Sequence, residues 1–124
     1  MLLVLKKEYI TTRISYRVTK DFKNEFNDIC KKRAVVASKL KRNWALNFMS
    51  NIGFENFKIK RFELYSDINP DAVVNDQVYF NSIEEKTSFL KYCESKGISA
   101  SDFFRTCQEN FIISGDPAQA ERKE

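Results

Sequence analysis

Apolar and polar residues follow the same plan in two segments of the chain, residues 13–49 and 75–111. Each segment opens with alternating apolar and polar residues and continues with two stretches in which apolar residues recur every three or four positions. Alternation is typical of a strand with one buried face, and the longer spacing is typical of an amphipathic helix. Each segment therefore predicts a strand followed by two helices, and a shift of 63 residues superposes the helical stretches. Such a repeat indicates that the two units bury each other's apolar faces.

The first unit has its predicted strand at 13–18, with Ile14, Tyr16 and Val18 on the buried face. Thr19 supplies a hydroxyl cap for the next helix. The apolar stripes of its two helices are Phe22, Phe26, Ile29 and Cys30, and Leu40, Trp44, Ala45 and Phe48.

The second unit has its predicted strand at 76–81. The cap of its first helix is Asn81 or Ser82; Ser82 and Glu85 have the spacing of a capping box, and Ser99 caps the second helix. Gly97 is expected in the left-handed conformation that ends many helices. The corresponding apolar stripes are Phe89, Tyr92 and Cys93, and Phe103, Phe104, Cys107 and Phe111.

Between the units, the chain is aromatic and charged rather than rich in Gly and Ser, which predicts a packed connector. Its apolar spacing fits neither a strand nor a helix. Gly115 and Pro117 end the last helix, so we expect a disordered tail. The resulting division is a first unit (1–50), a connector (51–73), a second unit (74–115) and a tail (116–124).

Composition favours a folded protein with one strongly basic part. Of the 124 residues, 43% are hydrophobic and 14% aromatic, which is ample for a core. Residues 1–50 hold 12 Lys/Arg against 4 Asp/Glu, whereas residues 51–124 hold 9 against 13. This asymmetry is expected of a protein that presents one face to a polyanion, although an uneven solvated surface would look the same.

Residues suited to catalysis are scarce. The chain has no histidine, which removes the usual general base and metal ligand, and its three glycines form no phosphate-binding loop. The adjacent Glu84 and Glu85 fit the first turn of a helix, where they complement its dipole. The three cysteines have no metal-ligand spacing and are expected to be buried thiols. We therefore expect no enzyme activity, no cofactor and no metal.

The chain shows no sequence signal for a membrane or for secretion. Its first apolar run, MLLVL, is far shorter than the roughly 18 residues that a membrane helix needs. It also lacks the basic start and cleavage site of a secretory signal. A cytoplasmic location is the expectation.

The polar face of the first strand carries candidate chemistry. With the apolar residues buried, Arg13, Ser15 and Arg17 project from the opposite face. Two such strands paired antiparallel form a ribbon that fits the DNA major groove, where arginine contacts guanine and serine contacts several bases. A solvent-facing edge strand would also carry these residues.

The repeated strand-helix-helix plan resembles the ribbon-helix-helix family of DNA-binding proteins. The resemblance rests on RISYRVTKDFKNEFNDICKKRAVVASKLKRNWALNFM and on SKGISASDFFRTCQENF, which has the family's Gly-apolar-Ser-x-Ser sequence between the helices. It implies a mainly α fold with a short antiparallel two-stranded β-ribbon, in which the two units form a pseudo-dimer within one chain. Ala34 and Val36 depart from the family's glycine and serine in the first unit, and the second strand needs one extra residue before its helix.

The resemblance also implies which residues bind DNA. Base contacts would come from the ribbon, and phosphate contacts from the start of each second helix, as helix N-termini favour. The expected base-contacting residues are Arg13, Ser15, Arg17, Asn75, Gln77 and Tyr79. The expected phosphate-contacting residues are Ala37, Ser38, Lys39, Lys41, Arg42, Ser99, Ala100 and Ser101, with Lys20 and Lys23 behind them.

Tandem units in one chain are similar to TraY-type relaxosome accessory proteins of conjugative plasmids. That similarity implies sequence-specific double-stranded DNA binding at a transfer origin, with a relaxase or coupling protein as a further partner. The alternative is a transcriptional repressor of the autoregulatory, copy-control or antitoxin type. A second alternative is a protein-interaction module with a relic DNA-binding fold. The expected state is a monomeric pseudo-dimer or a weak homodimer on DNA.

Overall fold

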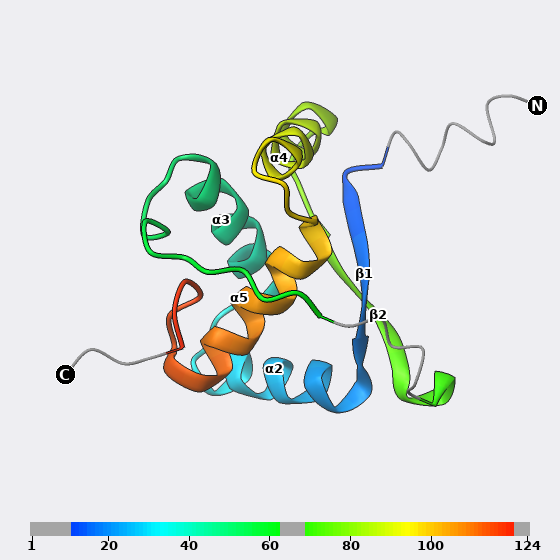
Figure 1. The fold of residues 1–124 in the computed structure, drawn as a ribbon. Coiled ribbons are helices and arrows are strands. Elements are labelled where there is room, and N and C mark those ends of the chain that lie inside the picture. The colour runs from blue at the N-terminus through cyan, green and yellow to red at the C-terminus, as the bar shows by residue number, and fades with distance from the viewer. Residues whose placement is uncertain (1–10, 63–68, 121–124) are drawn as a thin grey trace, which may run out of the picture.

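A computed structural model describes residues 11–62 and 69–120 of the chain (Figure 1). These residues form a two-stranded antiparallel sheet and four α-helices, so the expected mainly helical fold with a β-ribbon is confirmed. The helices gather on one side of the ribbon (Figure 1). In chain order the elements are β1 (Arg13–Thr19), α2 (Lys20–Lys32), α3 (Ala37–Met49), the 3-10 turn η2 (Pro70–Ala72), β2 (Val73–Tyr79), α4 (Ile83–Ser95) and α5 (Ala100–Ser114).

The ribbon pairs β1 with β2 from Arg13 opposite Tyr79 to Thr19 opposite Val73. The predicted limits of the second strand, 76–81, were wrong, because the strand both starts and ends earlier. The strand begins earlier than predicted because Val73 and Val74 also pair with the end of β1. After the strand, the Phe80 backbone N–H still donates to the Thr12 carbonyl at 2.9 Å.

The predicted hydroxyl caps are confirmed in three helices. Thr19 accepts from the Phe22 N–H, Ser82 from the Glu85 N–H and Ser99 from the Asp102 N–H. Helix α3 differs because Val36 occupies its cap position and has no side-chain oxygen to accept a hydrogen bond.

The breaks between helices use the same backbone conformation at equivalent positions. Gly97 has a φ of 71°, as expected, and Ala34 has a φ of 55° at the corresponding place in the first half. This left-handed conformation is costly for any residue with a Cβ. Ala34 therefore adopts the conformation for which the second half uses glycine.

The two halves of the chain are interlocked. Helix α3 packs against β2 and α4, whereas α5 packs against β1 and α2. Aromatic rings join the halves in the core: Phe26 and Trp44 both contact Phe111, with ring centroids 6.0 and 5.6 Å apart. Each second helix thus covers the strand and first helix of the other half.

The described part of the connector is packed without being a helix or strand over residues 51–62. Phe54 and Phe57 lie against Phe48 and Phe103, with ring centroids 5.5 to 5.7 Å apart. Thr106 of α5 also exchanges hydrogen bonds with the Lys60 backbone. Residues 63–68 of the connector lie outside the described residues.

The expectation of a disordered tail was wrong for residues 116–120, which fold back onto α5. Ala118 is buried, and the Asn110 side-chain amide donates to the Pro117 carbonyl at 2.9 Å. The Ser114 hydroxyl donates to the Gln119 carbonyl at 2.6 Å. The apolar contact of Ala118 and these hydrogen bonds fix the segment; residues 121–124 lie outside the described part.

The three cysteines are free and buried, as the sequence predicts. Burial raises the pKa of Cys93 to about 12 and raises the pKa values of Cys30 and Cys107. Across residues 11–62 and 69–120, no helix combines the length and apolar character needed to cross a membrane.

Candidate nucleic-acid interface

The outer face of the ribbon is a row of polar and aromatic side chains in register across the two strands. The residues that face the helices alternate with these and are buried, because side chains on a strand point to opposite faces in turn. Every base-contacting residue expected from the sequence lies on the outer face, and these residues form three directly opposed pairs: Arg13 with Tyr79, Ser15 with Gln77, and Arg17 with Asn75.

Hydrogen bonds hold the strand backbone in place and orient one side chain of this face. The Tyr79 hydroxyl donates to Gln77 Oε1 at 2.7 Å, which orients the Gln77 amide. At the other end of the ribbon, Lys23 Nζ donates to the Asn75 carbonyl at 2.9 Å and Arg105 Nε donates to the Arg17 carbonyl at 2.8 Å. The strand edges are thus bound by side chains from α2 and α5.

The start of α3 lies beside one end of this face. A depression of about 410 Å³ joins them and is lined by Ser38, Lys39, Arg42, Asn43, Tyr79 and Asn81. The first turn of α3 has no acidic residue and no side-chain cap. Its backbone N–H groups and the exposed Lys39 therefore suit an anion. Ala37 and Ser38 are half-buried at the same helix start.

Lys41 was wrongly expected to contact phosphate. Only 2% of the residue is exposed, and its ammonium lies 2.9 Å from Asp76 Oδ1 beneath the ribbon. It also donates to the Gln77 carbonyl. Lys41 occupies the apolar stripe of α3, one turn before Ala45, so its side chain points into the core.

Arg42 lies at the rim of the depression but is already paired. Its Nε and Nη2 each lie 2.7 Å from a carboxylate oxygen of Glu85 in α4. This bidentate hydrogen bonding lowers the pKa of Glu85. A phosphate contact would require Arg42 to leave this pair.

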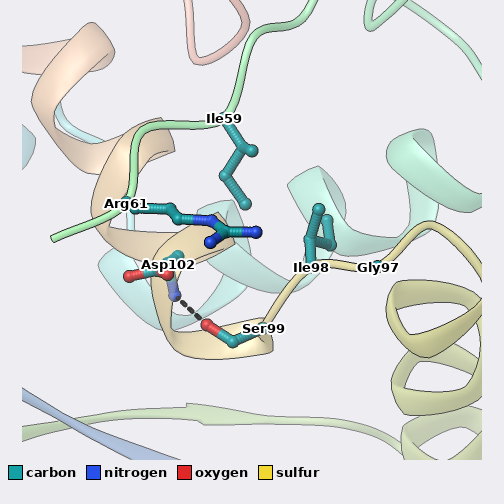
Figure 2. Close-up of a pocket in the computed structure, with 6 residues that line it drawn as sticks. All are labelled: Ile59, Arg61, Gly97, Ile98, Ser99 and Asp102. Carbon is teal, nitrogen blue, oxygen red and sulfur yellow. Dashed lines mark hydrogen bonds between the residues drawn. The ribbon is translucent and has the colours of Figure 1, made fainter.

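The start of α5 is less suited to a phosphate than the start of α3. The Ser99 hydroxyl already accepts from the Asp102 N–H at 3.0 Å, and Asp102 adds negative charge to the first turn. Figure 2 shows the connector passing over this helix start, with Arg61 above Asp102. Asp102 also accepts from the Phe62 backbone and from Arg105. Ala100 and Ser101, expected as phosphate contacts, are half-buried here.

A buried polar network beneath the ribbon was missed by the sequence reasoning. Asp76 accepts from Gln108 Nε2 at 2.9 Å, and Gln108 Oε1 accepts from the Tyr16 hydroxyl at 2.8 Å. Together with Lys41 these residues form a continuous chain, hereafter the polar network, made of Tyr16, Lys41, Asp76 and Gln108. In the described residues, every fully buried side-chain nitrogen or oxygen has a hydrogen-bond partner. Two features of the sequence could have indicated this network: Asp76 lies at a core-facing position of a strand, and Lys41 lies in the apolar stripe of a helix.

Burial and charge act against each other in this network. Burial alone would raise the pKa of Asp76, but the charge of Lys41 and the hydrogen bonds from Lys41, Gln108 and the Gln77 N–H together outweigh it, so the pKa lies below its usual value. Burial lowers the pKa of Lys41, and Asp76 offsets part of that effect. Burial also raises the pKa of Tyr16 well above its ordinary value, so this hydroxyl stays a donor.

The described residues contain no cluster of three or more His, Cys, Asp or Glu side chains placed to hold a metal.

No protein-family model, curated protein or solved structure matches the chain.

Proposed function

We propose that this protein binds double-stranded DNA by placing the outer face of its ribbon in the major groove. The observation that carries the proposal is the row of three cross-strand pairs, which exposes arginine, serine and amide side chains together. These are the side chains that recognise base edges, and a two-stranded ribbon has the width of the major groove. The row ends beside the uncapped, basic start of α3, which is suited to a backbone phosphate.

The proposal includes a pseudo-dimer of two ribbon-helix-helix units. The helices repeat with a shift of 63 residues, and the outward and inward faces of the strands correspond with a shift of 62. Under the strand shift, Ser15 is paired with its own equivalent, Gln77, as expected if a local two-fold axis passes through the middle of the ribbon. The exchange of α3 and α5 between halves supports the same arrangement.

Contact with phosphates is expected mainly through the first unit. Ser38 and Lys39 would bind through the start of α3, and the exposed Lys20 at the start of α2 lies at the opposite end of the ribbon. The corresponding turn of α5 is capped and carries Asp102. The net charge of the two parts of the chain favours the same off-centre grip.

A relaxosome accessory role at a plasmid transfer origin is the setting we propose, on the strength of the tandem ribbon-helix-helix resemblance. A transcriptional repressor would use the same contacts. Footprinting on DNA of the protein's own replicon separates them, because protection at a transfer origin favours the first role and protection at a promoter favours the second.

The test of DNA binding is selection from a random duplex library, followed by affinity measurements over a range of salt concentrations. A selected site, with affinity that falls steeply as salt rises, would support the proposal. Failure to enrich any sequence, with only salt-insensitive binding to other proteins, would refute it and leave a protein-interaction module.

A further inference from the structure

The polar network breaks the internal repeat of the core. Each of its members occupies a buried position whose equivalent in the other half is also buried but apolar. Within the helices, Lys41 corresponds to Phe104 and Gln108 to Ala45. Within the strands, Asp76 corresponds to Ile14 and Tyr16 to Val78. At each of these four pairs of equivalent positions, one half has a polar side chain and the other half has an apolar one.

The network's contacts join the first half to the second. Lys41 and Tyr16 belong to the first half, whereas Asp76 and Gln108 belong to the second. The bonds from Lys41 to Asp76 and from Tyr16 to Gln108 therefore cross between halves, at 2.9 and 2.8 Å. Tyr16 also stacks on Phe104 of the second half, with ring centroids 5.5 Å apart.

Pairing between like halves of two chains would leave these groups without their partners. If two first halves paired, each Lys41 would face Ile14 of the other chain in place of Asp76. If two second halves paired, each Asp76 would face Phe104 in place of Lys41. A buried charge without its counter-charge is strongly unfavourable, and the two-fold symmetry of such a dimer would impose it twice.

We propose that the polar network specifies pairing of a first half with a second half. It thereby prevents two molecules from associating through two first halves or two second halves. Buried polar groups can determine which partner is chosen by penalising the alternatives. This inference rests on the two-unit arrangement proposed above but not on DNA binding, so its test is independent of any DNA measurement.

A thiol introduced at position 15 reports which halves are paired. Ser15 lies opposite Gln77 in the native ribbon, and in a pairing of two first halves it would lie opposite Ser15 of the other chain. The Phe80–Thr12 hydrogen bond sets the alternation of the ladder and makes position 15 a non-hydrogen-bonded pair, where facing side chains are closest. The natural cysteines are buried, so the introduced thiol is the accessible one.

The experiment compares Ser15→Cys in the full chain with Ser15→Cys in a chain that also carries Tyr16→Phe, Lys41→Met, Asp76→Leu and Gln108→Met. Both are refolded at about 1 mM, so that pairing between chains can compete with pairing within one chain, and then mildly oxidised. We expect dimers linked by a disulfide between the two introduced thiols in the apolar variant, at roughly ten-fold or more the fraction seen with the native network. Equal dimer fractions in the two chains would overturn the proposal.

Two further variants make the result decisive. Ser15→Cys with Gln77→Cys in the native chain should link position 15 to position 77, and disulfides that join position 15 to 15 or 77 to 77 of two chains would also overturn the proposal. If circular dichroism shows that the apolar variant does not fold, Lys41→Met with Asp76→Asn replaces it. That pair removes both charges and keeps an amide between Gln77 and Gln108, and the same excess of dimer is expected from it.

Discussion

Lys39 and Asp102 occupy the same position in the two halves, the first turn of α3 and of α5, and carry opposite charges. Lys39 is exposed at an uncapped helix start beside the ribbon. Asp102 is bonded to Arg105 at 3.2 Å and to the connector backbone. The start of α3 is thus suited to an anion, whereas the start of α5 already carries the carboxylate of Asp102.

Replacing Lys39 with Ala should weaken binding to every DNA sequence and lower the salt slope, the change in log affinity per change in log salt, by about one unit. The reason is the loss of one phosphate contact without loss of a base contact. Fluorescence anisotropy at several salt concentrations measures both quantities. Lys58→Ala removes the same charge beside the C-terminal turn and should change neither. Ser101→Glu in the second unit should weaken binding less than Lys39→Ala; a larger loss would contradict the off-centre grip.

Arg13→Ala and Arg17→Ala should each cost roughly 1–3 kcal/mol on the selected DNA site and less on random duplex. Both side chains lie on the outer face of the ribbon, where a contact to a base edge depends on sequence. Competition binding with the two DNAs gives the difference. Equal losses on both DNAs would assign these arginines to phosphates.

Lys41→Met should lower the free energy of unfolding by about 3–5 kcal/mol at neutral pH, because it leaves the Asp76 carboxylate buried without its counter-charge. Urea denaturation measures the loss. Lys39→Met, an equivalent change at an exposed position of the same helix, should stay within about 0.5 kcal/mol of the native protein. Lys41→Met combined with Asp76→Leu should recover most of the stability.

The contribution of Asp76 to the pH dependence of stability should differ in sign between the native chain and Lys41→Met. In the native fold the pKa of Asp76 is lowered, so its contribution is present above the unfolded value of about 3.9 and is lost as pH falls through the folded value. Without Lys41, burial raises that pKa, so the variant's deficit should shrink as pH falls from 7 towards 4. A deficit that stays constant over this range would show that Asp76 is not the group affected.

Cutting the chain near Asn69, in the connector, should give two fragments that fold poorly alone and better together. Each fragment would lack the helix and strand that cover its core, because α3 and α5 pack on the opposite halves. Circular dichroism of the separate and mixed fragments tests this. Two cooperative, independently folded fragments would contradict a shared core.

The elements of this fold follow from short-range patterns in the sequence. The alternation around Tyr16 and the spacing of Phe26, Trp44, Phe89 and Phe103 predict the strand faces and the helices, and the hydroxyl caps predict where three helices begin. These signals suffice because each depends on neighbours within one or two turns. The extent of β2 was not predictable in this way, since its first residues are set by pairing with the end of β1.

The candidate site was predictable only where it depends on neighbouring residues in the sequence. The outward row of the ribbon follows from alternation alone, whereas the role of Lys41 depends on Asp76, which is distant in the chain. A lysine among basic neighbours suggests a phosphate contact until its counter-charge is known. The fold-back of residues 116–120 likewise depends on the hydrogen bond from the Asn110 amide to the Pro117 carbonyl, which no local pattern encodes.

The three pairs on the ribbon are unlike from end to end: arginine faces tyrosine at one end and asparagine at the other. Turning the ribbon by half a rotation in the groove would exchange these ends and place different chemistry on the same bases. A symmetric dimer on a palindrome has no such distinction. If the ribbon binds in the groove, the two orientations of the chain on a given site would not be equivalent. The complex would then be asymmetric, with the two sides of the DNA site facing different ends of the ribbon.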